Sequence, residues 1–304
     1  MKKIIKENSL FILIVIVITV LSQIRLPYYI NTGGGTININ NRISYEGKKE
    51  LKGSLNMLYV TEYVATIPTY LMSYLLRDWD LESIEESRIS NETTKDIEKR
   101  NKIMLENSIN TAKYVAYKTA GEEIKVSSKK TEVIATTLDN QLKIGDEIIK
   151  INDQIVEDTT TIKKEIELEI PIQEENNHKI IGIIVITNYD YQTKKNITLH
   201  FRKSESGSSG GLMMTLSMYM ALTQEDLLKG RKIAGTGTID MEGHVGEISG
   251  IKYKIIGANK HHMDVVLVPK ENYKEAMKVA KERNYKMKIV KVETLEEAIE
   301  YLKK

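Results

Sequence analysis

Residues 205–215 read ESGSSGGLMMT, a turn of small residues that runs directly into the apolar segment Leu212–Leu222. A short Gly/Ser stretch by itself is typical of a flexible linker. At the start of a helix, however, the first N–H groups lack intrahelical partners and lie at the positive end of the helix dipole. A serine held there could act as a nucleophile beside its own oxyanion hole. The rest of the chain has to decide between these interpretations.

Composition indicates a folded protein without cysteine chemistry. At 304 residues the chain has room for about two domains plus short appendages. It is 41% hydrophobic and 28% charged, and its formal net charge of +2 gives no argument for nucleic acid as a partner. The absence of cysteine excludes disulfides and thiol catalysis.

The amino terminus combines basic charge with an apolar run. Lys2, Lys3 and Lys6 precede Leu10–Leu21, which with Ser22 to Ile24 reaches 15 residues, short of the roughly 20 that span a bilayer. A cleaved signal peptide, a signal anchor and a buried helix are the candidates. No small-x-small cleavage site follows, and tyrosines at 28 and 29 suit a membrane interface. We therefore expect a cytoplasmic tail over residues 1–9, an uncleaved transmembrane signal anchor over 10–30, and everything after Arg25 outside.

Residues 31–117 form an expected extracytoplasmic lead-in region with both strands and helices. Three consecutive glycines at 33–35 predict a turn, with strands over 36–39 and 53–60. The apolar patch 66–76 predicts a packed helix. An acidic first turn at Asp80 predicts a long helix over 79–117.

Residues 118–202 predict a small β domain. Gly145-Asp146 predicts a tight turn into an alternating strand, and Asn152-Asp153 predicts a hairpin turn. Residues 145–156 resemble the G-D-x-I-x-x-I-N-x-x-x-V segment of PDZ domains. A helix over 160–169 and strands over 179–188 and 194–201 complete the expected order. The resemblance implies capture of extended peptides at an exposed edge; the alternative is a small β domain without a ligand.

From residue 203 to residue 304 the pattern changes to a compact α/β domain. Apolar periodicity predicts alternating helices and strands, over 212–222 (helix), 265–269 (buried strand), 272–284 (helix), 287–292 (strand) and 295–302 (closing amphipathic helix).

Three motifs in this region resemble those of the Lon-type serine peptidases. Gly207–Gly211 resembles their G-P-S-A-G nucleophile turn, Thr236–Ile239 their T-G-x-I strand, and Ser249–Lys254 their G-G-[LI]-K-x-K segment. With the expected anchor and the PDZ-like domain, the chain resembles the membrane-anchored, ATP-independent Lon-like peptidases of Gram-positive bacteria. No G-x-x-x-x-G-K-[ST] motif of an ATPase occurs in the sequence.

Carried over position by position, the resemblance makes Ser209 the nucleophile and Lys254 the general base. It gives Thr236 the role of orienting the lysine amine, and the backbone N–H groups of Ser208, Ser209 and Gly210 the oxyanion hole. Lys252 is the competing lysine, but at about 100° per helical residue it points roughly 200° away from Lys254. Its alternative interpretation is a solvated surface residue.

The match has departures, and other chemistry is weaker. Ser208 stands where the family usually has proline, and Gly210 where alanine is common, which predicts a looser turn. The five histidines show no metal-ligand spacing, so we expect no metal and no cofactor.

We therefore expect a mixed α+β fold with an amino-terminal transmembrane helix, a helical and β lead-in, a PDZ-like domain and a Lon-type proteolytic domain. The expected function is cleavage of exported or membrane-associated peptides and proteins through an acyl-enzyme. The alternative is a membrane-anchored peptide-binding module with an inactive protease fold. Expected partners are protein or peptide substrates, docked by the PDZ-like domain, and membrane lipid, but not nucleic acid. The oligomeric state and the substrate stay open.

Overall fold

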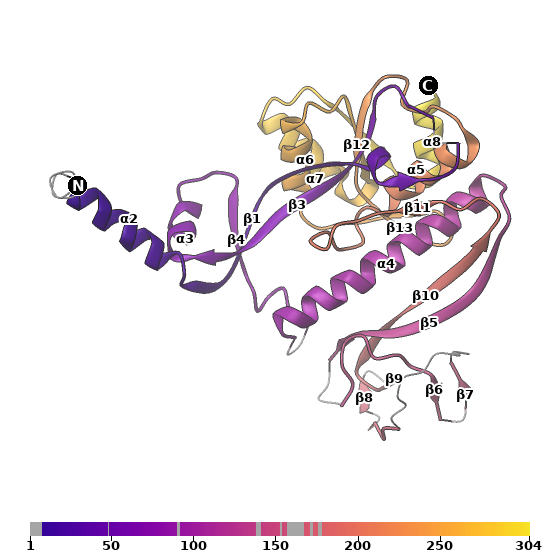
Figure 1. Ribbon diagram of the computed structural model, residues 1–304, viewed down its shortest axis with the longest axis horizontal. Helices are drawn as coiled ribbons and strands as arrows, with labels where there is room; N and C mark the ends of the chain where they lie inside the picture. The colour runs from indigo at the N-terminus through magenta and orange to yellow at the C-terminus, as the bar shows by residue number, and fades with distance from the viewer. Residues whose placement is uncertain are drawn as a thin grey trace.

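The computed structural model describes residues 8–47, 49–89, 92–137, 141–152, 154–156, 167–170, 173–175 and 178–304. One six-stranded sheet, in the order β16-β15-β12-β3-β1-β4, joins distant parts of the chain (Figure 1). The side from β3 to β16 is parallel, whereas β1 runs antiparallel to both β3 and β4. Its strands are β1 (Arg25–Asn38), β3 (Ser54–Thr66), β4 (Trp79–Ser83), β12 (Lys232–Gly235), β15 (Val265–Pro269) and β16 (Lys288–Val292).

Helices cover both faces of this sheet. The helices are α5 (Gly211–Thr223) and α8 (Leu295–Lys303) on one face, α4 (Thr94–Thr119) packed outside α5, and α6 (Ile251–Lys260) and α7 (Lys270–Glu282) on the other face. Alternate residues of β15 enter opposite cores: Val265 and Leu267 pack with α5, whereas Val266 and Val268 pack with α6 and α7. This two-residue alternation, buried on both sides, explains the continuous apolar run of the strand. The helices and strands expected after residue 203 are confirmed.

Glycines let α6 approach β1 closely. Residues 33–35 do not form the predicted turn; they lie within β1, where the register with β3 shifts between Thr32 and Gly35. A Cβ on Gly34 would lie 1.7 Å from the carbonyl oxygen of Tyr59, and one on Gly257 of α6 would lie 2.9 Å from the carbonyl carbon of Gly34. Gly257 thus lets α6 approach β1 closely, whereas Gly34 lets β1 and β3 approach each other.

The long helix of the lead-in begins later than its sequence predicted. Residues 79–83 form β4, which pairs with β1, and α4 starts only at Thr94. The start is fixed by a capping box in which Thr93 Oγ1 accepts from the Asp96 N–H, and an Asp96 carboxylate oxygen accepts from the Thr93 N–H. Acidic residues near position 80 therefore marked no helix start.

A long antiparallel pair carries the middle of the chain away from the sheet (Figure 1). It consists of β5 (Ile124–Thr136) and β10 (Ile183–Thr193), which pack on α4 at one end. Small pairs lie at the other end: β6 (Lys150–Ile151) with β7 (Gln154–Ile155), and β8 (Gln173–Glu175) with β9 (His178–Ile180). Asn152 has a φ of 53°, which suits the predicted hairpin turn. The predicted helix over 160–169 lies outside the described residues, except that residues 167–169 hold no helix.

Two short strand pairs and a 3-10 turn complete the fold, and one of the pairs joins an early segment to a late one. β2 (Ile43–Ser44) pairs with β11 (Thr198–Leu199), and β13 (Thr238–Ile239) pairs with β14 (Val245–Gly246). A 3-10 turn, η1 (Ile39–Asn41), leads from β1 into β2.

The expected division into a lead-in at 31–117 and a proteolytic domain at 203–304 does not describe this packing. β1 and β3 lie in the same sheet as β12, and α4 runs past the boundary at 117 to contact α5. Sheet pairing joins residues that are far apart in sequence, so changes in local pattern did not reveal it.

The amino-terminal segment differs from the predicted anchor over 10–30. Helix α2 (Ser9–Leu21) ends before β1, in which Tyr29 and Ile30 are buried and pair with Val64 and Tyr63. Among the described residues, no helix is both long enough and apolar enough to cross a membrane. The bounds of the predicted anchor are therefore wrong, because its second half belongs to the sheet.

The segment 66–76 forms a helix, but one that does not pack as predicted. Helix α3 (Ile67–Ser73) has no buried residue, and Leu75 just after it is 84% exposed.

The glycine contact predicts an unequal effect of two neighbouring substitutions. Gly34→Ala should destabilise the fold by about 1–3 kcal/mol or more, because the new methyl group meets the backbone of β3. Gly33→Ala is the matched control, since its Cβ first meets only the Cγ2 atom of the Ile256 side chain. Urea unfolding of both variants checks this; equal losses would contradict the packing described.

Candidate functional site

The turn before α5 is held from outside by α4. Gly207, with a φ of 91°, donates its N–H to the carbonyl of Asn101 at 3.0 Å. Ser108, also on α4, donates its hydroxyl to the carbonyl of Ser208 at 3.1 Å. These two bonds fix the backbone on the amino-terminal side of Ser209. Reasoning from local sequence missed these two bonds, because Asn101 and Ser108 lie about a hundred positions before their partners.

Ser209 lies at the start of a buried helix. Every residue of α5 from Gly211 to Leu222 is buried, so the helix cannot move without disrupting the core. The N–H groups of Gly211 and Leu212 donate to the carbonyls of Ser208 and Gly237. No hydrogen bond within the described part of the chain uses the N–H groups of Ser208, Ser209 or Gly210. These three groups are therefore free to serve as the predicted oxyanion donors.

Gly210 makes the turn tight rather than loose. A Cβ at this position would lie 2.0 Å from the sulfur of Met57, on β3. A Cβ on the next residue, Gly211, would lie 2.8 Å from the backbone nitrogen of Ile239. The two glycines thus allow β3 and β13 to pack directly against the nucleophile turn, which accounts for glycine where the family commonly has alanine.

Lys254 is a lysine almost without solvent contact. Its residue is 3% exposed, on the inner side of α6. Burial lowers the pKa of its amine to about 8, since the charged form loses its hydration. A base with such a pKa is neutral in a substantial fraction of molecules near neutral pH.

Thr236 joins Lys254 to Ser209. Lys254 Nζ donates to Thr236 Oγ1 at 3.0 Å, and that hydroxyl donates to the carbonyl oxygen of Ser209 at 2.9 Å. The same carbonyl accepts the N–H of Gly237 at 2.8 Å. The hydrogen-bonded path from Lys254 to Ser209 thus runs through the hydroxyl of Thr236. Thr236 is fully buried, so its hydroxyl holds the amine at a fixed position beside the turn.

Lys252 has a different partner. Its amine forms an ion pair with Asp80 on β4, and the hydroxyl of Tyr253 donates to the same carboxylate oxygen at 2.5 Å. The two lysines therefore point apart, as helical spacing predicted, but Lys252 is ion-paired rather than simply solvated. Asp80 thus holds the first turn of α6 against β4.

A cleft of about 1630 Å³ opens beside Ser209 and Lys254. Ser208, Ser209, Gly210 and Lys254 line it, together with residues 57–62 of β3. Glu62 and Glu82 add carboxylates to the part formed by β3 and β4, and Asn31 Nδ2 donates to Glu82 Oε2 at 2.6 Å. Of the predicted site residues, Ser208, Ser209, Gly210 and Lys254 are thus brought together in one open groove, and Thr236 lies buried behind them.

A group of possible metal ligands lies elsewhere on the surface. Asp240, Glu242 and His244 are exposed, with ligand atoms within 4.8 Å of one another, and His244 Nδ1 lies 2.9 Å from Asp240 Oδ2. The hydrogen bond to Asp240 raises the pKa of His244. Sequence spacing did not single out this trio, which occupies the turn between β13 and β14 and does not line the cleft. Exposed acidic side chains in a turn do not by themselves make a metal site.

Comparison with known proteins shows that most of the chain matches one family. Residues 84–303, which are 220 of the 304 residues, match the family described as Lon protease (S16) C-terminal proteolytic domain. The match starts ahead of α4 rather than at the expected boundary of 203.

Curated relatives agree over shorter stretches. Lon protease of Campylobacter concisus is 26% identical over 182 residues, 59% of this chain and 22% of that protein. Lon protease of Trichlorobacter lovleyi is 33% identical over 95 residues, 31% of this chain and 11% of the relative. Lon protease of Aster yellows witches'-broom phytoplasma is 32% identical over 91 residues, 30% of this chain and 11% of the relative. The chain spans less than a quarter of the length of these relatives.

Burial of Lys254 predicts that removing the amine stabilises the fold. Below pH 8 the folded state must bury a charged ammonium. Between pH 8 and the ordinary lysine pKa near 10.4, the amine is protonated in the unfolded state but largely neutral in the folded state, so the unfolded state binds more protons. Wild-type stability therefore rises with pH across that window. Lys254→Met should be more stable than wild type at pH 7, by at most about 3 kcal/mol, with a difference that shrinks toward pH 10.

Urea unfolding at the two pH values measures this difference, with Lys252→Met as the matched control. The control loses a partly exposed ion pair and should gain no stability. A Lys254→Met variant that is less stable than wild type at pH 7 would contradict the burial described.

Proposed function

Because the chain belongs to the Lon protease (S16) C-terminal proteolytic domain family, we propose that it is an ATP-independent serine endopeptidase with Ser209 as nucleophile and Lys254 as general base. The observation that carries the proposal is the buried amine of Lys254, joined through Thr236 to the backbone of Ser209. A buried lysine with a lowered pKa has no structural benefit that an apolar residue would not supply better. Its presence beside a serine in a cleft therefore favours catalysis.

The proposed reaction proceeds through an acyl-enzyme. Neutral Lys254 takes the proton of Ser209 Oγ, and the oxygen attacks the carbonyl carbon of the peptide bond. The N–H groups of Ser208, Ser209 and Gly210 stabilise the oxyanion that forms. The Lys254 ammonium then protonates the leaving amine, which departs and leaves an ester on Ser209. Neutral Lys254 next takes a proton from water, the resulting hydroxide attacks the ester carbonyl, and the ammonium returns the proton to Ser209 Oγ as the acid product leaves.

Substrate binding is proposed along β3. β12 pairs with residues 54–57 of this strand, and the residues that follow, 58–62, line the cleft. An extended peptide could add to this edge through main-chain hydrogen bonds, which select an unfolded segment rather than a particular sequence. The strand leads directly to the nucleophile turn, because Met57 contacts Gly210.

We further propose that α2 attaches the chain to a membrane, with the cleft on the extracytoplasmic side, and that substrates are exported or membrane-associated proteins. Ten large apolar side chains between Leu10 and Val20 are each at least 37% exposed, and no residue of α2 is buried. Such a helix, which carries no charged residue, is poorly suited to water. The basic residues Lys2, Lys3 and Lys6 precede it in the sequence.

Cleavage of unfolded casein and of a short peptide by the full chain in detergent, without ATP, tests the dyad. Ser209→Ala and Lys254→Ala should each lose activity about 100-fold or more, because one lacks the nucleophile and the other the base. Lys252→Ala should keep most of its activity, since Lys252 pairs with Asp80.

An inactive Lys252→Ala variant would mean that the base is Lys252 and not Lys254. If wild type neither cleaves these substrates nor reacts at Ser209 with a serine-directed probe, the endopeptidase proposal fails. The peptide-binding module would then be the better interpretation.

Peptide docking by the PDZ-like region also remains a proposal, and the structure offers a clean excision point. The N–H of Thr137 donates to the carbonyl of Gly182 at 2.8 Å, at the end of the β5–β10 pair. Replacing residues 138–181 with an Asn-Gly turn should close this pair as a hairpin.

The variant without residues 138–181 should keep cleavage of a short peptide, because none of the residues that the structure describes between 124 and 193 lines the cleft. Casein cleavage should fall several-fold if the region delivers protein substrates. Rates for both substrates, with urea unfolding as a check on the fold, measure this. Equal changes for casein and peptide would contradict a docking role.

A further inference from the structure

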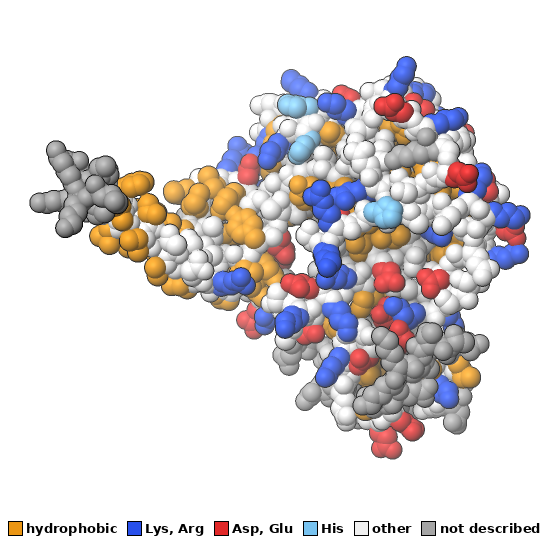
Figure 2. All heavy atoms as spheres, in the orientation of Figure 1, with side chains coloured by type: hydrophobic (Ala, Val, Ile, Leu, Met, Phe, Trp, Pro, Cys, Tyr) orange, Lys and Arg blue, Asp and Glu red, His pale blue; other side chains and the backbone are white. Residues whose placement is uncertain are grey.

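The apolar surface of α2 continues onto a second element. We call residues 67–76, which comprise α3 and the turn after it, the α3 lobe. Its exposed apolar side chains are Leu71, Met72, Tyr74, Leu75 and Leu76. α3 contacts α2, and Figure 2 shows the hydrophobic side chains of both as one region at the amino-terminal end of the molecule.

The lobe is a built structure rather than a frayed end. Pro68 occupies the first turn of α3, and Thr66 and Thr69 form a reciprocal capping box. Ser73 Oγ donates to the carbonyl of Tyr70 at 2.6 Å near the end of the helix. Local hydrogen bonds thus order a helix whose large apolar side chains point outward.

Tyrosines lie at the base of the lobe. The rings of Tyr28 and Tyr70 lie 5.4 Å apart, those of Tyr70 and Tyr74 lie 5.5 Å apart, and the last two share a hydrogen bond of 2.9 Å between their hydroxyls. Tyrosine combines an apolar ring with a polar hydroxyl, so it collects at the level of lipid headgroups.

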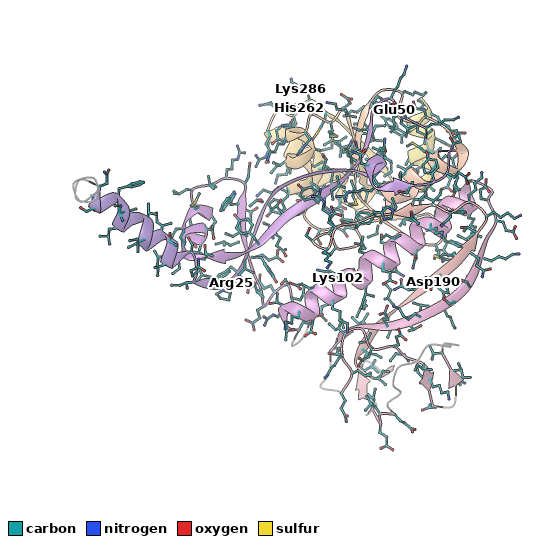
Figure 3. All side chains as sticks on the ribbon, viewed as in Figure 1. Arg25, Glu50, Lys102, Asp190, His262 and Lys286 are labelled. Carbon is teal, nitrogen blue, oxygen red and sulfur yellow. The ribbon has the colours of Figure 1, made fainter. Side chains whose placement is uncertain are left out.

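Charge at the rim of the lobe is positive. Arg25, at the start of β1, and Arg77, just after the lobe, are both exposed (Figure 3 labels Arg25). The nearest acidic residue in sequence, Asp78, is bound by Arg283 of α7. Two arginines beside an apolar surface complement anionic headgroups.

From these observations we infer that the α3 lobe inserts into the interfacial layer of an anionic lipid bilayer, beside α2. The inference rests on the proposed membrane attachment by α2 and adds a second contact. One helix alone would let the molecule swivel about its attachment, whereas two neighbouring contacts fix its orientation.

This orientation matters for the cleft. β3 ends at Thr66, where the lobe begins, and its residue Met57 contacts the nucleophile turn. Nine residues of extended chain span at most about 30 Å. Met57, which contacts the turn that carries Ser209, therefore lies within about 30 Å of the start of the lobe, which favours substrates whose cleaved segment is close to the bilayer surface.

Single-cysteine variants of the full chain test the inference, because the native sequence has no cysteine. Leu75→Cys, Ile14→Cys and Glu50→Cys are each labelled with an environment-sensitive dye and reconstituted in vesicles of equal parts phosphatidylcholine and phosphatidylglycerol. Leu75 probes the lobe, Ile14 probes α2, and Glu50 is an exposed control that Figure 3 places far from α2. Quenching by lipids that carry a spin label near the headgroup or near the chain end gives the depth of each dye.

We expect the dye at position 75 to shift to the blue and to be quenched most by the shallow label, with no quenching at position 50. Quenching at 14 but not at 75 would overturn the lobe contact and leave the attachment by α2 intact. No quenching at either position would overturn both. A blue shift at 75 that depends on protein concentration and not on quencher lipids would show that a second copy of the chain covers the lobe, which also overturns the inference.

Discussion

The burial of one amine, that of Lys254, is the constraint on which the rest of the site depends. An ammonium out of water is costly, so the pKa of the amine falls to about 8, and this is what would let it act as a base. Such burial requires α6 to lie very close to the sheet. Glycine supplies that closeness on both sides, at Gly33 in β1, where a Cβ would meet the Ile256 side chain, and at Gly257 in α6, where a Cβ would meet the backbone of β1. The packing of a helix on a strand therefore sets the electrostatics of the cleft.

The nucleophile turn is held just as firmly, but by other parts of the chain. α4 binds its backbone from outside through Asn101 and Ser108, β3 fills the space beside Gly210 with Met57, and Thr236 binds the carbonyl of Ser209. Each partner comes from a different element, and the buried α5 gives the turn a rigid base. A serine and a lysine that lie 45 positions apart are thus positioned by contacts that reach back to residue 34. Precise placement of this kind is what catalysis by proximity needs.

Local pattern predicted the elements after residue 203, because strand and helix periods there are clear, and short motifs selected Ser209, Thr236 and Lys254, which the fold brings together. It did not predict how earlier segments join them. Residues 33–35 were expected in a turn, since consecutive glycines usually break a strand, yet they lie inside β1 to admit α6. Residues 25–30 were assigned to an anchor for their apolar character, yet the sheet buries Tyr29 and Ile30. In each case the deciding partner lies far away in the sequence, where a window of local periodicity cannot reach.

β3 connects the core, the cleft and the α3 lobe. Its first four residues pair with β12 inside the core, its next residues line the cleft, and its last residue begins the α3 lobe. Pairing with β1 extends from Asn56 to Thr66 of the strand, with register shifts between Arg25 and Tyr29 and between Thr32 and Gly35, so the same strand connects the cleft to the lobe. Whatever holds the lobe therefore also orients the groove that leads to Ser209. Under the proposed membrane contact, the exposed amino-terminal elements are part of how the site meets its substrate.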